Sequence, residues 1–285
     1  MRIAAVSDLH GLKPRFAPLA RLLEEGIDTL LVAGDVARGG YPEVQQADVR
    51  ENFGLLLKGR RGVRIFAIPG NDDWTIVEST LREFQEVSVP TDRACPLDAR
   101  FSVVGYPFVP VTPFMMKDYE KWDTPDEPVL PAGREDLERA LVERGINISG
   151  LRSDGLSLRE FSFDLADRTE NIAADMERLA ALSDPRDTIY LIHCPPAGYR
   201  DGGLSPQGSK PIGSRAVLDS IRKHMPLMTV HGHSHEAVDR GGGEFWFPTG
   251  ETAVLLVGPG NDPAVLNFLL LDLATGHCER NRMTA

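Results

Sequence analysis

Along the first seventy residues, short apolar runs alternate with segments whose apolar residues recur at helical spacing. The apolar runs predict buried strands at residues 3–6, 29–33 and 63–68. The segments between them, 16–23 and 44–57, have the periodicity of helices. Strands that alternate with helices favour βαβ units and a mostly parallel sheet. In such a sheet, ligands bind beyond the carboxyl ends of the strands.

The middle of the chain has a different pattern, because prolines interrupt it. They are Pro107, Pro110, Pro113, Pro125, Pro128 and Pro131. Their fixed φ angles and missing N–H donors exclude a regular helix or a central strand. Large apolar residues are interspersed at Phe108, Phe114, Met115, Met116, Tyr119 and Trp122. Such a segment is too apolar for a disordered linker. We expect a single domain over residues 1–285, with an insertion or lid at about 106–134 that walls the site.

The rest of the chain predicts more helices and strands. Helices are expected at residues 135–144, 169–182 and 215–223. Strands are expected at residues 188–192, 227–230, 245–247, 253–257 and 265–271. A hairpin is expected within 146–163, and Ser214 can cap the last helix. Gly and Pro turns between the last three strands favour antiparallel pairing. Periodicity alone thus indicates a mixed α/β protein.

Composition and charge narrow the class of protein. A chain of 285 residues with 42% hydrophobic content can bury a large core. Its net charge of −11 disfavours bulk binding of nucleic acid or anionic lipid. No apolar run reaches the roughly 20 residues that span a bilayer, and the first run is too short for a signal peptide. Cys95, Cys194 and Cys278 form no C-x-x-C pair, which favours the reducing cytoplasm.

Five short polar motifs each follow an apolar run. In chain order they are Asp8-Leu9-His10, Gly34-Asp35, Gly70-Asn71-Asp72-Asp73, His193 and Gly232-His233-Ser234-His235. Each is a weak signal by itself, because Asp8 and His10 suit ordinary turns and His193 suits a buried core position. Together they bring seven metal-binding side chains to the ends of successive strands. That conjunction favours a two-metal site.

The order and spacing of these motifs resemble the calcineurin-like metallophosphoesterase superfamily. The resemblance implies an α/β fold, an αββα sandwich of two mixed β-sheets flanked by helices. It also implies two divalent ions, with Asp35 as the bridge between them. The first ion would be held by Asp8, His10, Asp35 and His235. The second ion would be held by Asp35, Asn71, His193 and His233.

The ligand types limit the metals. Mixed imidazole and carboxylate ligation suits Mn, Fe, Zn or Co better than Ca or Mg, and we favour Mn. Two such ions, about 3.5–4 Å apart, can activate a bridging hydroxide as nucleophile and clamp the phosphate oxygens. By resemblance, the reaction is hydrolysis of a phosphoester.

The candidate catalytic residues are Asp35, Asn71, Asp72 and His231. Many members of the superfamily have a histidine at the position of Asp72, and that histidine is thought to protonate the leaving group or to bind the phosphate. An ionised Asp72 cannot donate a proton, so this difference favours diesters or other substrates with a good leaving group. His231 is the next candidate for the proton.

Other polar residues have two interpretations each. If residues 231–235 stay extended, alternation places His231 on the same strand face as His233 and His235. His231 and Asp73 could then each hydrogen-bond to a metal ligand and so orient it, or they could be ordinary turn residues. The glycine-rich loop 195–214 carries Arg200 and Lys210. Arg200 could contact a substrate phosphate near a helix N-terminus, or it could lie on a solvated surface loop.

The leading functional prediction is a cytoplasmic, metal-dependent phosphodiesterase or phosphomonoesterase that acts on a small phosphorylated substrate. A nuclease of the same superfamily is an alternative, which the acidic charge and the lack of a basic stripe disfavour. A non-catalytic metal-binding scaffold is the third hypothesis. Such a scaffold is expected to have lost ligands, whereas this sequence has all seven.

Overall fold

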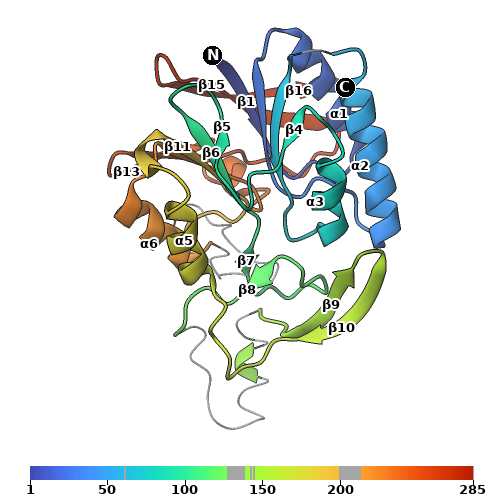
Figure 1. Ribbon diagram of the computed structural model, residues 1–285, viewed down its shortest axis with the longest axis vertical. Coiled ribbons are helices and arrows are strands. Elements are labelled where there is room, and N and C mark those ends of the chain that lie inside the picture. Colours follow the sequence, from blue (N-terminus) through green and yellow to red (C-terminus); the bar gives the residue numbers. More distant parts are fainter. Residues whose placement is uncertain (61, 127–138, 142, 144, 199–212, 285) are drawn as a thin grey trace.

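The computed structural model describes residues 1–60, 62–126, 139–141, 143, 145–198 and 213–284. Two six-stranded sheets lie face to face around a shared apolar core (Figure 1). The first sheet has the order β16 (His277–Thr284), β15 (Val265–Asp272), β1 (Arg2–Val6), β2 (Thr29–Ala33), β3 (Arg64–Ile68), β4 (Val87–Ser88). The second has the order β13 (Trp246–Thr249), β14 (Thr252–Leu256), β12 (Met228–His231), β11 (Thr188–Ile192), β6 (Ser102–Tyr106), β5 (Cys95–Pro96).

Alternation along the central strands explains the layers. In β1, Ile3 and Ala5 pack between the two sheets, whereas Ala4 and Val6 pack under the outer helices. β11 alternates in the same way between the two cores. Successive side chains of a strand point to opposite faces, so a strand that is apolar throughout can join two layers.

Helices cover the outer face of each sheet. The first sheet packs against α1 (Lys13–Glu24), α2 (Pro42–Leu57) and α3 (Thr75–Leu81). The second packs against α5 (Ile172–Ala180) and α6 (Arg215–His224). The predicted αββα sandwich is therefore confirmed. Ser214 caps α6 as expected, because its hydroxyl accepts a hydrogen bond from the N–H of Val217 at 3.0 Å.

Strand direction determines where the site lies. β1, β2 and β3 are parallel to one another, and so are β6, β11, β12 and β14. The expected antiparallel pairing of the strands at 245–247, 253–257 and 265–271 holds for the first two only. β13 and β14 are antiparallel, whereas β15 lies in the other sheet, antiparallel to β1 and β16. The sequence pattern also missed β16, the short helix α7 (Ala237–Arg240) and the 3₁₀ turn η1 (Pro185–Asp187).

The proline-rich segment forms the short parallel strands β7 (Val109–Pro110) and β8 (Glu120–Lys121). The expected hairpin is present as β9 (Ser149–Asp154) and β10 (Ser157–Ser162). The Asp118 carboxylate accepts hydrogen bonds from the N–H groups of Thr75, at the start of α3, and Ser153, in β9, both at 2.9 Å. It thereby ties the segment to the body. Most of the helix expected at 135–144, and residues 127–134 of the insertion, lie outside the described residues.

Candidate metal centre

The expected ligands converge from both sheets, beyond the carboxyl ends of the strands. From the first sheet come Asp8, His10, Asp35 and Asn71, and from the second come His193, His233 and His235. Each follows the end of β1, β2, β3, β11 or β12, at the edge where parallel strands place their ligands. Five separate motifs thus lie in one place, because the two sheets face each other.

Sharp backbone turns aim several of these side chains. Asp8, His10, Asp35 and His233 have positive φ angles of 52°, 48°, 51° and 64°. Residues other than glycine rarely adopt this conformation, and it clusters at functional sites. Backbone hydrogen bonds between the loops hold the turns, since Asp8 N–H donates to Gly34 O and His10 N–H donates to Asp35 O, both at 2.9 Å.

Two glycines leave room for the ligands. A Cβ atom added to Gly34 would lie 2.3 Å from Nδ1 of His193, and one added to Gly70 would lie 2.3 Å from Oδ1 of Asp35. Real Cβ atoms do not approach so closely. The glycines of the G-D and G-N-D-D motifs therefore allow the close packing of the centre.

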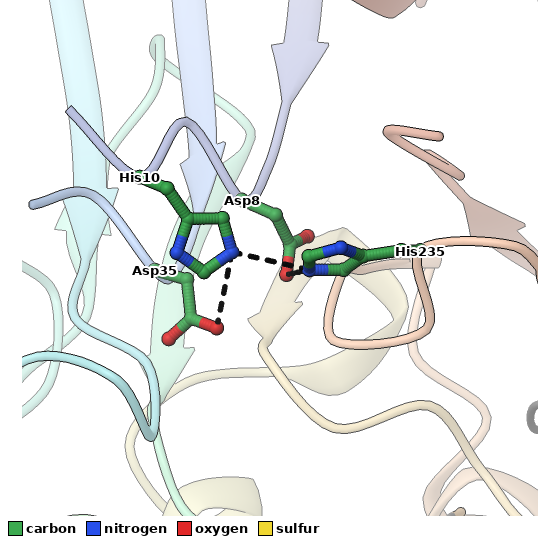
Figure 2. A group of neighbouring side chains, drawn as sticks. All are labelled: Asp8, His10, Asp35 and His235. Atoms are coloured by element: carbon green, nitrogen blue, oxygen red, sulfur yellow. Dashed lines mark hydrogen bonds and ion pairs between the residues drawn. The ribbon is translucent and has the colours of Figure 1, made fainter. Parts of the chain in front are cut away.

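The first group of side chains contains Asp8, His10, Asp35 and His235, each offering one ligand atom within 4.8 Å of all the others (Figure 2). The Nε2 atoms of His10 and His235 are 3.1 Å apart. Nε2 of His235 is 3.2 Å from Oδ1 of Asp8, and Nε2 of His10 is 3.9 Å from Oδ2 of Asp35. Imidazole nitrogens and carboxylate oxygens thus point at one small volume.

The second group of side chains also meets at Asp35. Nε2 of His193 is 3.3 Å from Oδ2 of Asp35 and 3.1 Å from Oδ1 of Asn71. The rings of His193 and His233 meet edge to face, with centroids 5.2 Å apart. The same Asp35 oxygen therefore faces His10 in one group and His193 in the other.

His193 is held with one nitrogen toward the centre. Its Nδ1 lies 2.8 Å from the carbonyl oxygen of Ala33, which accepts the Nδ1 proton. That contact leaves the Nε2 lone pair free for a cation. Burial alone would lower the pKa of His193, but the Asp35 and Asp8 carboxylates outweigh it and raise the pKa to about 10. In turn, His193 outweighs burial and holds the pKa of Asp35 well below its usual range.

These residues fit divalent cations. The buried carboxylates favour the protonated, positively charged form of His193 because they need a positive charge nearby. A bound cation would supply that charge in place of the proton. Carboxylate oxygens, an amide oxygen and neutral imidazole nitrogens are ligands of first-row transition metals. Burial lowers the pKa of His233 to about 4, so its ring stays neutral, as ligation requires.

Asp72 and Asp73 are neighbours with different surroundings. Asp73 is fully buried, and its carboxylate accepts N–H hydrogen bonds from Gly70, Val36 and Ala37, all at 2.9 Å. It thus pins the loop after Asp35 to the turn that carries Asn71. The Asp72 side chain is 43% exposed, and its Oδ2 lies 3.9 Å from Nδ1 of His10. Burial and the Asp35 carboxylate raise the pKa of Asp72 to about 6.

His231 does not share a strand face with His233 and His235. β12 ends at His231, and the left-handed turn at His233 interrupts the alternation. The buried His231 ring lies 2.8 Å from the Cys194 carbonyl through Nδ1 and 2.8 Å from the Thr229 hydroxyl through Nε2. Burial lowers its pKa to about 4. These contacts support the loop that carries His193, and a catalytic role for His231 stays a prediction.

Sequence reasoning missed two buried polar residues that hold the ligand loops. Arg15 in α1 donates through its guanidinium to the carbonyl oxygens of Asp8 and, at 3.1 Å, Gly260. Gln45 in α2 donates to Asp72 O and accepts from Trp74 N–H, both at 2.7 Å. The sequence signal that could have identified these two residues was a polar side chain on the helix face that the apolar spacing predicts to be buried.

Two further predictions concern the glycine-rich loop and membrane-spanning helices. Arg200 and Lys210 lie outside the described residues, so the proposed phosphate contact of Arg200 stays a prediction. Within the described ranges, no helix has the length and apolar character to cross a membrane.

Comparison with known proteins agrees with this geometry. The sequence matches the family model of calcineurin-like phosphoesterases over residues 1–237. The chain therefore belongs to the calcineurin-like phosphoesterase family. No curated protein matches the sequence significantly.

Solved structures share the fold at low identity. One that is 16% identical aligns with a TM-score of 0.60 over 99% of each chain. A dimetal phosphatase from Danio rerio is 12% identical, with a TM-score of 0.54 over 100% of this chain and 98% of that one. At these identities the likeness shows the shared fold.

Proposed function

We propose that this protein is a binuclear-metal-dependent phosphoester hydrolase. The observation that carries the proposal is the convergence of ligand atoms from Asp8, His10, Asp35 and His235 within 4.8 Å of one another. Asp35 joins this cluster to His193, which lies 3.3 Å from the same carboxylate. Membership in the phosphoesterase family supports the reaction class.

The proposed ligand assignment follows the two groups. Asp8, His10 and His235 belong to the first ion, and Asn71, His193 and His233 belong to the second. Asp35 is the bridge, because Oδ2 faces a histidine of each group. The mixed donor set suits Mn, Fe, Zn or Co, with Mn favoured. When bound, such ions lower the pKa of water and neutralise charge on phosphoryl oxygens.

The chain itself orients these groups. Asp72 N–H donates to Oδ1 of Asp35 at 2.9 Å, which fixes the carboxylate while its Oδ2 faces the histidines. The half-exposed Asp72 side chain lies beside His10, where a leaving group can approach from solvent. Although the pKa of Asp72 is raised to about 6 by burial and by Asp35, two cations bound beside it would lower that pKa again. Asp72 would then be ionised and provide no proton, which favours substrates whose leaving group departs unaided, such as diesters of acidic alcohols.

We further propose a single domain over residues 1–285, with the insertion at about 106–134, acting in the cytoplasm on a small phosphorylated molecule. The net charge of −11 supports a small substrate over a long polyanion. Cys95, Cys194 and Cys278 are all free thiols, in keeping with a reducing compartment.

A substrate panel tests the proposed function. Purified protein, depleted of metal and resupplied with Mn²⁺, is assayed on p-nitrophenyl phosphate, bis(p-nitrophenyl) phosphate and single- and double-stranded DNA. We expect hydrolysis of the small esters, with the diester favoured, and little cleavage of DNA. Efficient DNA cleavage would favour the nuclease. Inactivity on every substrate with Mn, Fe, Zn and Co would support the non-catalytic scaffold.

A further inference from the structure

A second hollow lies in the region of the insertion, with none of the proposed metal ligands in its lining. Its volume is about 250 Å³. Aromatic side chains of Trp122, Phe161 and Phe163 line it together with the charged residues Arg152 and Glu170. The three rings form a continuous edge-to-face stack, with successive centroids 5.4 and 4.9 Å apart. The hollow therefore combines a rigid apolar wall with charges of both signs.

Arg152 is held in place without using its terminal nitrogens. Its guanidinium carbon lies 3.5 Å from the centroid of the Phe161 ring, and its Nε donates to the carbonyl of Lys117 at 3.0 Å. In the described part of the chain, neither terminal nitrogen has a hydrogen bond or ion pair. A stacked, pre-oriented guanidinium whose two terminal nitrogens have no partner among the described residues is suited to a carboxylate or phosphate group.

Glu170 supplies the opposite charge. Burial lowers the pKa of Arg152, and the Asp118 and Glu170 carboxylates only partly offset this effect. Arg152 and Glu170 both line the hollow, yet they form no ion pair within 4.0 Å. Glu170 is exposed and has no hydrogen-bond partner among the described residues. Lys121 also lines the hollow, but its ammonium is paired with Asp175 at 2.8 Å. Among the described residues that line the hollow, Arg152 and Glu170 thus carry charges without an ion pair.

Two more carboxylates affect which ligand can enter. Asp164 and Asp167 line the hollow and each accept a hydrogen bond from a nearby backbone N–H, at 2.8 and 2.9 Å. With Glu170, they repel a ligand that carries only negative charge. Arg152 likewise repels a ligand that carries only positive charge.

We infer that this hollow binds a small zwitterion, with an acidic group against Arg152, an ammonium group against Glu170, and an apolar body against the aromatic wall. The free arginine donors and the unpaired glutamate are both satisfied by one such molecule. This inference concerns a site apart from the proposed phosphoesterase centre and does not depend on it.

A matched series of probes tests the inference by calorimetry on the full chain. 4-Aminobutanoate carries both charges, whereas butanoate and butylammonium carry one each on the same carbon chain. We expect 4-aminobutanoate to bind at least roughly tenfold more tightly than either, since each hydrogen-bonded charge adds a comparable factor. Equal binding of all three, or binding of none at 10 mM, would overturn the inference.

Charge-removing variants separate the two ends of the ligand. Arg152→Gln and Glu170→Gln are each expected to weaken 4-aminobutanoate binding by about tenfold or more. Glu170→Gln should also improve butanoate binding, a change of preference that unfolding cannot imitate. Arg159→Gln is the control, because Arg159 pairs with Arg152 in the hairpin but is exposed and does not line the hollow. An unchanged preference in Glu170→Gln would contradict the proposed orientation.

Discussion

At the scale of single residues, the metal centre depends on backbone conformations that its own side chains tolerate. Asp8 and Asp35 are left-handed, and aspartate is among the residues that enter this region most readily. Each such residue costs about 1–3 kcal/mol, so the conformation persists only where the surroundings fix it. Here the Asp73 carboxylate fixes the loop after Asp35 through the N–H groups of Val36 and Ala37. These hydrogen bonds thus orient the proposed ligands.

The bridging role of Asp35 gives the first prediction. Asp35→Asn removes a negative charge shared by both groups and should weaken both ions at once. Mutating a residue that only hydrogen-bonds to a metal ligand typically lowers metal affinity 10–100-fold. Asp35 is itself a proposed ligand, so its mutation should lower metal affinity by more than that. Asn71→Ala should mainly empty the second position. Metal analysis of the dialysed variants measures both effects, with the exposed Asp154→Asn as control. Two tightly held ions in Asp35→Asn would refute the bridge.

Asp72 determines the expected leaving-group selectivity. A positioned general acid contributes about 10²–10⁴-fold, and it matters most when the leaving group is a poor one, such as an alkoxide. Asp72, kept ionised by two bound cations, would give no such help, so the wild type should strongly prefer aryl over alkyl phosphoesters. Asp72→His should raise kcat/KM for alkyl esters and narrow the gap. Similar wild-type rates on both ester types would mean that another residue, with His231 first to be mutated, supplies the proton.

The side chains that the structure brings together were largely predictable, because each proposed ligand belongs to a motif that follows an apolar run. Arg15 and Gln45 were not, since their roles exist only after α1 and α2 pack beside the ligand loops. The predicted position of His231, on one strand face with His233 and His235, was wrong. The expected alternation assumed an extended segment, and the left-handed turn at His233 could not be read from the spacing.

At the scale of elements, a buried ion pair holds the proline-rich segment together. Lys117 and Glu120 have fully buried side chains, and Nζ lies 2.7 Å from Oε2. The Thr112 N–H also donates to this carboxylate at 3.1 Å. Lys117 Nζ donates in addition to the Thr112 carbonyl oxygen at 3.0 Å, so both buried charges are hydrogen-bonded.

This pair gives a stability prediction. Glu120→Gln alone leaves a buried ammonium without its counter-charge and should lower the free energy of unfolding by about 3–5 kcal/mol. Lys117→Met/Glu120→Gln should recover most of that loss, because no buried charge remains and the amide oxygen still accepts from Thr112. Urea denaturation of the two variants compares them. A double variant as unstable as the single one would contradict the role of the unpaired charge.

The same segment should influence substrate selectivity if it walls the centre. Phe114 and Met115 are neighbours in the sequence and are 52% and 57% exposed, so together they present apolar surface to solvent. Phe114→Ser/Met115→Ser should change the relative KM values of a substrate panel while metal content stays unchanged. Leu156→Ser is the control, because Leu156 is 51% exposed at the turn of the adjacent hairpin. Identical kinetics across the panel would make the segment a surface cover only.

At the scale of the whole molecule, the two-sheet architecture depends on contacts that sequence periodicity does not encode. Alternating strands and helices predicted the parallel first half. They could not indicate that β14 lies parallel to β12 or that β15 joins β1, because these pairings link strands far apart in the chain. The family resemblance supplied the sandwich, and the structure confirms it. That architecture brings motifs from residue 8 to residue 235 to one edge.

The most direct test of the two-ion centre is a titration of metal-free protein with Mn²⁺, followed by hydrolysis of bis(p-nitrophenyl) phosphate. The protein concentration is kept above the dissociation constants, so that activity reports stoichiometry. The account predicts no hydrolysis in metal-free protein and a plateau at two ions per chain. A plateau at one ion per chain, or activity that persists without metal, would contradict it.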